Sequence, residues 1–474
     1  MWTYFLPLLH FVLAAGIVFR VLTRRGLEPS VRLAWVMVVE ALPLVGILAY
    51  LMFGEVRMRR ADRNRRADVR QQLTNLWQPS ESAVELTGRF DTVTRMIRAV
   101  GGMQSVSGNR ATLLAEDDTA MDPMIAAIDA AQDHVHLLFY IWLDDHVGRR
   151  IADAVTRAAG RGVTCRVMVD AFGSRAFTRS AAWAGMKAAG VHLAQAYPMG
   201  LPVISMLWGR LDLRNHRKIA VVDGRVGFTG SRNASDQAFA VKAKYAPWVD
   251  IQMQLEGPVV RQMQATFLQD WMSYTGSDLG AMLDPLPPVS QPGQVAQVLP
   301  TGPDWREGTM SDALVTLIHA SRERLVLTTP YYIPDQPVES AIASAARRGV
   351  AVTLILPARN DSRLVQWVSE GFYRELLDAG VRIYLFKPGL LHAKIITVDG
   401  QAAMIGSANL DRRSFDLNYE MNVFWVSESL TAALDARQQT YIDRAAEITR
   451  DQVRAWSFWR RARANLAALA APLL

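Results

Sequence analysis

The chain has 474 residues, half of them apolar, with a net charge of +7 and a single cysteine, Cys165. This length and apolar content exclude a disordered chain and predict two or three domains with large cores. The single cysteine excludes an intramolecular disulfide, while the positive charge permits a polyanionic partner, either nucleic acid or an anionic membrane surface.

Two long apolar segments open the chain. Residues 2–19 contain no Asp, Glu, Lys or Arg, and residues 33–53 contain one charged residue, Glu40. Each segment is about long enough to cross a hydrocarbon core of roughly 30 Å. The first lacks the basic start and cleavage site of a signal peptide, so we predict a retained two-helix transmembrane hairpin over residues 1–56. Glu40 either faces a partner helix or the interface, or is a functional polar group inside the bilayer.

Arginines are concentrated after the second apolar segment. The residues that follow it include Arg57, Arg59, Arg60, Arg63, Arg65, Arg66 and Arg70, whereas Arg24, Arg25 and Arg32 lie between the two segments. Because the larger basic cluster stays inside, both termini and the body of the protein are predicted to be cytoplasmic. The same arginines are expected to lie beside anionic lipid headgroups.

After this cluster, the sequence repeats one order of predicted elements. An apolar helical segment precedes a buried strand within residues 121–142, and the same order returns within residues 311–333. In each half, two further helices end at a glycine and lead into apolar strands. This order predicts an α/β protein of two pseudo-symmetric halves, each with a mixed sheet. The predicted parts are a basic helical connector (57–105), a first half (106–275), a Pro-rich linker (276–300) and a second half (301–474).

Two apolar segments do not fit this repeat. The first half carries an insertion at residues 197–208 that is too apolar for an ordinary solvated loop. It either packs against the other half or forms a lip that dips into lipid. Near the C-terminus, Trp456, Phe458 and Trp459 are followed by Arg460, Arg461 and Arg463 and then by a short apolar tail. We expect an interfacial helix there, with a terminal core helix as the alternative.

One side-chain pattern occurs in both halves at identical spacing. His to Lys is two residues, Lys to Asp is five, and Asp to the glycine of a Gly-Ser pair is seven. Residues two apart in a strand share a face, so each histidine projects together with its lysine. Each aspartate precedes a glycine, the signature of a hairpin turn. The members are His216, Lys218, Asp223, Ser231 and Asn233 in the first copy and His392, Lys394, Asp399, Ser407 and Asn409 in the second.

We therefore expect the imidazoles and ammoniums to perform chemistry on a phosphate ester while the aspartates fix the hairpins. A single His-x-Lys would usually be a solvated strand end, but two in register are far beyond chance. His134 and His136 are interpreted as structural, because no carboxylate of suitable spacing accompanies them. Neither Gly-Ser pair forms a Gly-x-Ser-x-Gly elbow, which argues against a serine hydrolase.

The paired pattern resembles the two HxKxxxxD motifs of the phospholipase D superfamily. More narrowly, the apolar spans, the basic stretch and the strings at 140–142, 215–218 and 329–335 are similar to those of bacterial cardiolipin synthases. The resemblance implies two phospholipase D-like α/β/α halves whose motifs meet in one active site. It also implies a multi-pass protein of the bacterial inner membrane with a cytoplasmic catalytic domain.

The resemblance further implies a role for each site residue. One histidine of the pair His216 and His392 attacks phosphorus and forms a phosphohistidine, and the other protonates the departing alcohol; which does which stays open. Glu420, 13 residues after Ser407, and Asp250, 19 residues after Ser231, are the candidates that orient the imidazoles. The phosphoryl oxygens would be held by Lys218, Lys394, Ser231, Asn233, Ser407 and Asn409.

The implied reaction is transfer of a phosphatidyl group from one phosphatidylglycerol to another, giving cardiolipin and glycerol. No cofactor or metal is expected, and the expected partners are phosphatidylglycerol and anionic membrane lipids, without nucleic acid; a homodimer is possible. Alternatives are a membrane phospholipase D that releases phosphatidic acid, a synthase with another phosphatidyl donor, a nuclease, and a lipid-binding scaffold with an inactive site.

Overall fold

The structure, a computed structural model, describes residues 2–24, 29–55, 58–76, 82–198, 210, 212–283 and 293–469. The chain divides into two units. The N-terminal unit consists mainly of residues 1–63, and the body consists of residues 64–198 and 214–472. We describe each unit by itself.

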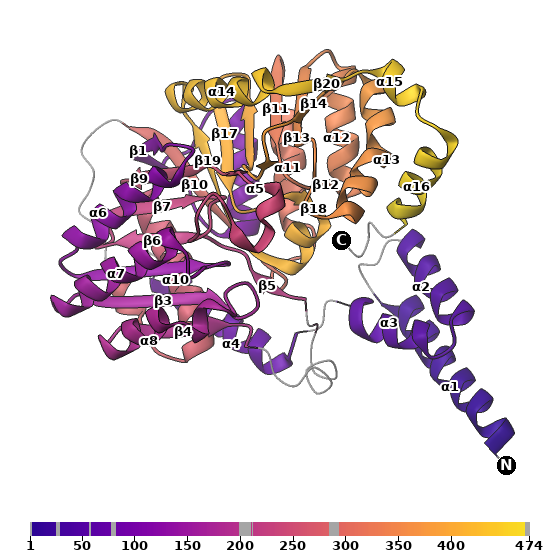
Figure 1. The fold of residues 1–474 in the computed structure, drawn as a ribbon, viewed down its shortest axis with the longest axis horizontal. Helices are drawn as coiled ribbons and strands as arrows, with labels where there is room; N and C mark the ends of the chain where they lie inside the picture. The colour runs from indigo at the N-terminus through magenta and orange to yellow at the C-terminus, as the bar shows by residue number, and fades with distance from the viewer. Residues whose placement is uncertain are drawn as a thin grey trace. The chain divides into compact units, whose positions relative to one another are not determined.

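The helices described in residues 2–55 of the N-terminal unit are α1 (Trp2–Thr23), α2 (Pro29–Ala41) and α3 (Val45–Phe53) (Figure 1). They pack through a small apolar cluster that includes Trp35 and Tyr50. The predicted second span is therefore divided into two helices. Pro43 lies in the break and cannot donate a helical hydrogen bond, and the next residue, Leu44, has a φ of 62°.

Among the side chains that the structure describes in this unit, most of the large apolar ones are exposed, including Phe11, Phe19 and Met37. Glu40 is also exposed, whereas Glu55 is buried and accepts hydrogen bonds from Arg20 and Tyr50. Within the described ranges, no helix combines the length and apolar character needed to cross a membrane. The transmembrane hairpin thus stays a prediction.

The body is built around one continuous sheet in which the two halves repeat the same strand order. The first half follows the order β4-β3-β2-β6-β7-β9-β1, and the second follows β14-β13-β11-β16-β17-β19-β10. In each half the first three strands are parallel and the others antiparallel, which confirms the predicted mixed sheets. The antiparallel pair β1 and β10 joins the halves. The first-half strands are β1 (Val106–Leu113), β2 (His134–Phe139), β3 (Thr164–Asp170), β4 (His192–Ala196), β6 (Ile219–Val222), β7 (Val226–Gly230) and β9 (Gln252–Glu256).

The second half has the same strands and one more at its edge. They are β10 (Gln294–Thr301), β11 (Arg324–Thr328), β13 (Ala351–Pro357), β14 (Arg382–Phe386), β16 (Ile395–Val398), β17 (Ala402–Gly406), β19 (Asn418–Val426) and β20 (Ala445–Ile448). Strand β10 begins inside the segment assigned to the linker. Pro300 was grouped with the linker prolines but lies in this strand, opposite Met421.

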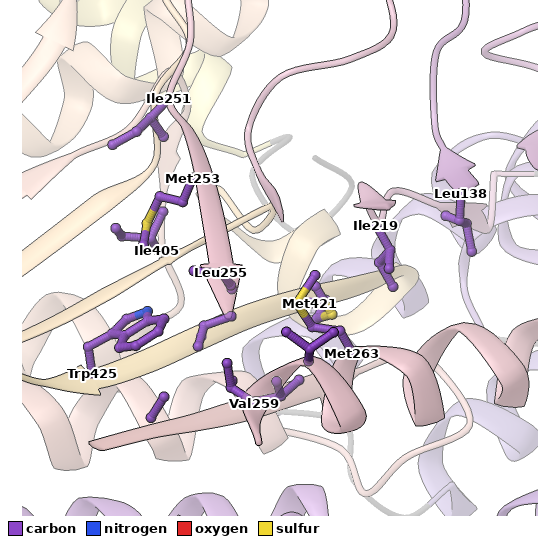
Figure 2. Close-up of a cluster of buried hydrophobic side chains, with 14 of the residues drawn as sticks. Leu138, Ile219, Ile251, Met253, Leu255, Val259, Met263, Ile405, Met421 and Trp425 are labelled. Carbon is purple, nitrogen blue, oxygen red and sulfur yellow. The ribbon is translucent and has the colours of Figure 1, made fainter. Parts of the chain in front are cut away.

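Helices cover both faces of the sheet. The outer cores are formed under α6 (Asp122–Ala130), α7 (His146–Gly160) and α8 (Ala181–Ala188) in the first half and under α11 (Thr309–Ala320), α12 (Gln336–Arg347) and α13 (Arg363–Ala379) in the second. The inner core lies under α10 (Val259–Thr275) and α14 (Glu428–Asp443) and is shared. Figure 2 shows Met263 of α10 beside Met421 of the second half, within this cluster.

The connector belongs to the body from residue 64 onward. Helix α5 (Arg89–Gly101) contributes Phe90, Val93 and Ile97 to the outer core of the second half. On α4 (Arg60–Leu76), Arg66 is only 3% exposed and is paired with Asp270 of α10. Arg70 of α4 pairs with Asp304 and lies over the ring of Trp305. The expectation that these two arginines face lipid headgroups is wrong, because the buried carboxylates of Asp270 and Asp304 hold them.

At the C-terminus, α15 (Arg450–Arg454) is followed by α16 (Phe458–Ala468), which packs on α13. Arg460 and Arg463 donate to the buried Glu370 of α13, while Phe458, Trp459 and Leu466 are exposed. One side of the helix is therefore attached to the body, and its interfacial role stays a prediction. The insertion at 197–208 lies outside the described residues except for Tyr197 and Pro198; the Tyr197 ring packs against Tyr274.

The two predicted Asp-Gly hairpins are present between β6 and β7 and between β16 and β17. Asp223 and Asp399 have φ values of 51° and 52°, and both following glycines are also left-handed. The Asp223 carboxylate accepts backbone N–H bonds from Gln132, Asp133 and His134 at 2.9–3.0 Å. Asp399 accepts the equivalent three bonds at the start of β11. Each aspartate thus fixes its turn and anchors the neighbouring strand.

We predict that Asp223→Ala lowers the free energy of unfolding of the body by about 2 kcal/mol, because three charge-assisted hydrogen bonds and a residue tolerant of positive φ are lost. Asp129, exposed and paired with Arg157, provides the control, for which Asp129→Ala should cost less than about 0.5 kcal/mol. Thermal unfolding of the two variants measures the difference. Equal melting temperatures would contradict this role for Asp223.

Candidate active site

The two histidine segments are each held by the opposite half of the protein. Strand β5 (Arg214–Asn215) pairs in parallel with β19, and β15 (Leu390–Leu391) pairs in parallel with β8 (Trp248–Val249). The pairing continues into the motifs, since the His216 N–H donates to the Tyr419 carbonyl at 2.9 Å and the His392 N–H donates to the Val249 carbonyl at 2.8 Å. The backbone therefore brings both motifs to the junction of the halves.

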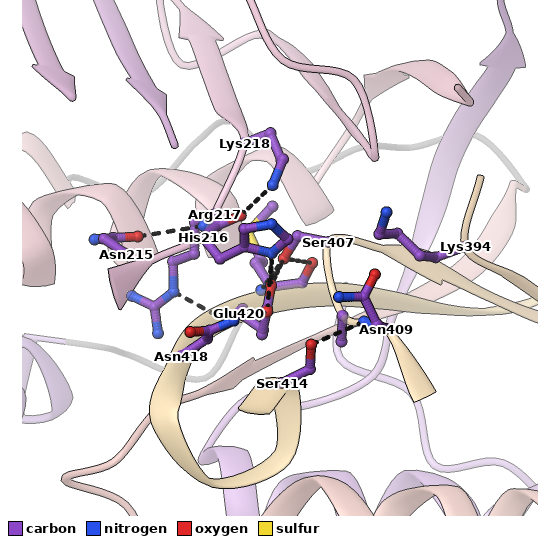
Figure 3. Close-up of polar contacts among 12 residues, drawn as sticks. Asn215, His216, Arg217, Lys218, Lys394, Ser407, Asn409, Ser414, Asn418 and Glu420 are labelled. Atoms are coloured by element: carbon purple, nitrogen blue, oxygen red, sulfur yellow. Dashed lines mark hydrogen bonds and ion pairs between the residues drawn. The ribbon is translucent and has the colours of Figure 1, made fainter. Parts of the chain in front are cut away.

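The imidazoles are oriented by carboxylates that also come from the opposite half. Nδ1 of His216 lies 2.9 Å from Oε1 of Glu420 (Figure 3). Nδ1 of His392 lies 2.6 Å from Oδ1 of Asp250. Glu420 and Asp250 were expected to orient histidines, but this exchange between halves was not foreseen. An ionised carboxylate accepts a hydrogen bond, so each ring carries its proton on Nδ1 and presents Nε2 to a substrate.

The two motif serines hold these carboxylates. The Ser231 hydroxyl donates to Asp250 and accepts from the Ile251 N–H at 3.0 Å. Ser407 does the same with Glu420 and the Met421 N–H. The hydroxyls are thus directed at the orienting acids, and their predicted contact with a phosphate stays a prediction.

The two motif lysines are buried and equivalent in their contacts. Nζ of Lys218 donates to the His216 carbonyl at 2.6 Å, and Nζ of Lys394 donates to the His392 carbonyl at 2.7 Å. Burial lowers the pKa of Lys218 to about 7 and that of Lys394 to about 8. An anion bound between them would restore the charged form, so the pair is suited to a phosphodiester.

Burial also controls the ionisation of the imidazoles. It lowers the pKa of His216 to about 4, because the neighbouring Glu420 offsets only part of the desolvation; the pKa of His392 is lowered in the same way. Burial alone would raise the pKa of Glu420 and Asp250, but the adjacent histidines and lysines outweigh it and keep both carboxylates ionised. The site therefore holds neutral, nucleophilic imidazoles at neutral pH.

The motif asparagines lie in the same region. Oδ1 of Asn233 accepts from the Ile141 N–H at 3.2 Å. Asn409 donates through Nδ2 to Asp411, while its buried Oδ1 has no partner among the described residues. Asp223 and Asp399 make their contacts at the far ends of β6 and β16, in the hairpins described above. Around His134 and His136, no cluster of the described residues has the composition of a metal site.

Sequence reasoning missed a buried polar network beneath His216. Asp270 of α10 accepts from Asn215 and Arg217, both at 2.8 Å, and from Arg66 at 3.1 Å. Arg217 also donates to the carbonyls of Glu420 and Thr301. No local pattern links these distant residues. The arginine between His216 and Lys218, where the second motif has Ala393, was the available signal.

Two aromatic rings that were not assigned to the site also contact the histidines. Tyr140 lies edge-on to His216 with ring centroids 4.8 Å apart, and Trp248 lies 4.9 Å from His392. Nε1 of Trp248 is buried with no partner among the described residues. Each imidazole thus has one aromatic neighbour of a different kind.

Comparisons with known proteins agree with this geometry. Residues 124–271 and 314–441 match the family described as "Cardiolipin synthase, PLD-like domain", and residues 12–55 match "Phospholipase_D-nuclease N-terminal". The chain is 36% identical to a protein named cardiolipin synthase A from Yersinia pseudotuberculosis, over 98% of this chain and 97% of that protein. It is 35% identical to cardiolipin synthase A from Yersinia pestis over the same shares.

The fold is also found in a solved structure. The crystal structure of phosphatidylserine synthase from Haemophilus influenzae matches with a TM-score of 0.59 at 14% identity, covering 81% of this chain and 100% of that chain. This identity supports the likeness of fold alone. The repeated match in both halves and the whole-length relatives show that the chain belongs to the cardiolipin synthase family of phospholipase D-like enzymes, as a phosphatidyltransferase.

Proposed function

We propose that this chain synthesises cardiolipin by transferring a phosphatidyl group from one phosphatidylglycerol to the terminal hydroxyl of another, with release of glycerol. One observation carries the proposal. The two imidazoles, each held at Nδ1 by a carboxylate from the other half, present two Nε2 atoms beside two buried ammoniums. This set can attack a phosphodiester, protonate an alcohol and neutralise an anion.

In the first step, Nε2 of one neutral imidazole attacks the phosphorus of phosphatidylglycerol. The second histidine, protonated when the anionic lipid is bound, gives its proton to the departing glycerol oxygen. The P–O bond to glycerol breaks as the P–N bond forms, and a phosphatidyl-histidine results. Lys218 and Lys394 would lie beside the phosphoryl oxygens, where negative charge is concentrated.

In the second step, the second histidine, now neutral, removes the proton of the incoming hydroxyl. The alkoxide oxygen attacks phosphorus, the P–N bond breaks, and the first imidazole returns to its neutral form. One phosphodiester replaces another, so no external energy source is needed. Asp250 and Glu420 stabilise the positive charge on whichever ring carries it.

The same site would hydrolyse lipid if water replaced the second alcohol. A phospholipase D activity and a different phosphatidyl donor are therefore the alternatives within lipid chemistry. We prefer cardiolipin synthesis because the relatives with this name match nearly the whole chain, including the N-terminal segment. One chain supplies both motifs, so dimerisation is not required for the chemistry.

Incubation of the purified full chain with phosphatidylglycerol alone should give cardiolipin and glycerol in equal amounts. His216→Ala and His392→Ala should each lower turnover by more than about a thousandfold, because each removes a group that bonds to phosphorus or transfers a proton. Lipid chromatography and glycerol release measure the products. Phosphatidic acid as the main product would indicate a phospholipase D. Full turnover in either variant would contradict catalysis by that histidine.

A further prediction concerns Glu420 and Asp250, the carboxylates that bond to the histidine of the other half. Glu420→Gln and Asp250→Asn should each lower kcat by about a hundredfold or more with a smaller change in KM, because an amide no longer fixes the Nδ1-protonated imidazole or stabilises its cation. Asp435→Asn, which changes a carboxylate of α14 that bonds to Thr397 and Arg324, provides the control. A kcat in Glu420→Gln equal to that of the control would contradict orientation across the halves.

We also propose that the N-terminal unit is embedded in the bacterial inner membrane as a hairpin, with the body in the cytoplasm. The exposed apolar side chains of α1 to α3, the match of residues 12–55 and the arginines after residue 56 support this arrangement. The lipid substrates would then reach the site from the inner leaflet.

Cysteine labelling tests this topology. The native Cys165 is buried, so a new thiol at Thr23→Cys, between the spans, or at Asp68→Cys, on α4, can be detected separately. In intact spheroplasts, an impermeant thiol reagent should label Thr23→Cys and should label Asp68→Cys only after lysis. Labelling of Asp68→Cys before lysis would overturn the predicted orientation.

A further inference from the structure

The pseudo-twofold symmetry that relates the two histidines does not extend to their neighbours. In the strand pair beside His216, Arg214 lies opposite Asn418. In the equivalent pair beside His392, Leu390 lies opposite Trp248. The protein therefore places a cation and an amide on one side of the site and two apolar side chains on the other.

These four residues lie on the same strand faces as the catalytic groups. Arg214 and Leu390 each precede a motif histidine by two residues, and Asn418 and Trp248 each precede an orienting acid by two. Side chains two apart in an extended segment project to one face. Arg214 and Asn418 therefore border the imidazole of His216. Leu390 and Trp248 border that of His392.

The pair beside His216 can bind a polar anion. Arg214 is half-buried, with its guanidinium 4.6 Å from the ring centroid of Phe172. Its charge lies close enough to lower the pKa of the Tyr140 hydroxyl, although burial raises that pKa to about 12 overall. Asn418 donates to Glu420 at 3.2 Å, and its buried Oδ1 has no partner among the described residues. This side thus combines a cation, which also faces the buried carboxyl of Asp170, with a buried amide oxygen that has no partner among the described residues.

The pair beside His392 has the opposite character. Leu390 is fully buried, and the Trp248 ring stacks on Phe239 with centroids 4.0 Å apart. Together with Leu143 they form an apolar cluster against His392. A phosphodiester placed here would lose its hydration without gaining a counter-charge from these side chains.

We propose that Arg214 and Asn418 form a subsite for the acceptor lipid, in which Arg214 pairs with the phosphodiester of the second phosphatidylglycerol and the Asn418 carbonyl accepts from the secondary hydroxyl of its glycerol headgroup. In this headgroup three carbons separate the attacking hydroxyl from the phosphate, with the secondary hydroxyl between them. Paired strands lie about 4.8 Å apart, which suits recognition of both groups. The inference rests on the proposed transphosphatidylation.

The subsite would favour transfer to a lipid acceptor over transfer to water. Water and free glycerol carry no phosphate, so neither gains the charge-assisted bond to Arg214. The binding energy of the phosphodiester is then used only when the correct acceptor is present. Arg214 acts as a specificity determinant, while the phosphorus chemistry is left to the histidines.

The test compares two acceptors in one assay. The purified full chain is incubated with phosphatidylglycerol and labelled glycerol, and the ratio of cardiolipin formed to label incorporated into phosphatidylglycerol is measured. Arg214→Gln should lower this ratio about tenfold, and Arg214→Lys should restore part of it. Arg382→Gln is the matched control, since Arg382 pairs with Glu447 at the start of β14, and it should change neither rate.

Three results would overturn the subsite. If the wild-type chain makes cardiolipin and Arg214→Gln leaves the ratio unchanged, or lowers both products equally, Arg214 does not select the acceptor. If the wild-type chain incorporates labelled glycerol but makes no cardiolipin, the proposed function fails together with the subsite. A lower ratio that Arg214→Lys does not raise would show that the charge is not what matters.

Discussion

The site depends on the exchange of carboxylates between the two halves. Glu420 is fully buried, and an isolated carboxylate in that position would cost several kcal/mol in lost hydration. Hydrogen bonds from His216 of the first half and from Ser407 of the second half offset this cost. Asp250 is compensated in the same way by His392 and Ser231. Separating the halves would leave both charges unpaired, so the interface and the catalytic site form one electrostatic unit.

The surrounding fold gives this unit its rigidity. The sheet runs unbroken from one half to the other through β1 and β10, and the inner core under α10 and α14 contains side chains from both halves. Close packing of this kind resists small displacements, because a shift of one half opens cavities in the other. Hydrogen bonds of 2.6–2.9 Å to both imidazoles can thus be maintained by the protein's own side chains.

Much of this arrangement could be predicted from the sequence, because the repeat carries both the strand order and the motif. Spacing showed that His216 and Lys218 share a face and that Asp223 lies in a turn. It could not show that Glu420 would contact the histidine of the other half, because alternation defines a face but not the partner across an interface. The number of arginines in this segment also could not show which of them is buried. Arg66 is buried against Asp270, whereas other arginines of the same helix are exposed.

The salt bridge between Arg66 and Asp270 also bears on where the polypeptide can be shortened. Asp270 anchors Asn215 and Arg217 on either side of His216, and Arg66 supplies part of its counter-charge from α4. A truncation that removes α1 to α3 but retains α4 keeps this support for the segment that carries His216. A cut placed after residue 70 would remove Arg66 and leave the buried Asp270 with one fewer cation. The segment around His216, which Asp270 anchors, would then be held less firmly. The first helix after the apolar region is therefore part of the minimal catalytic core.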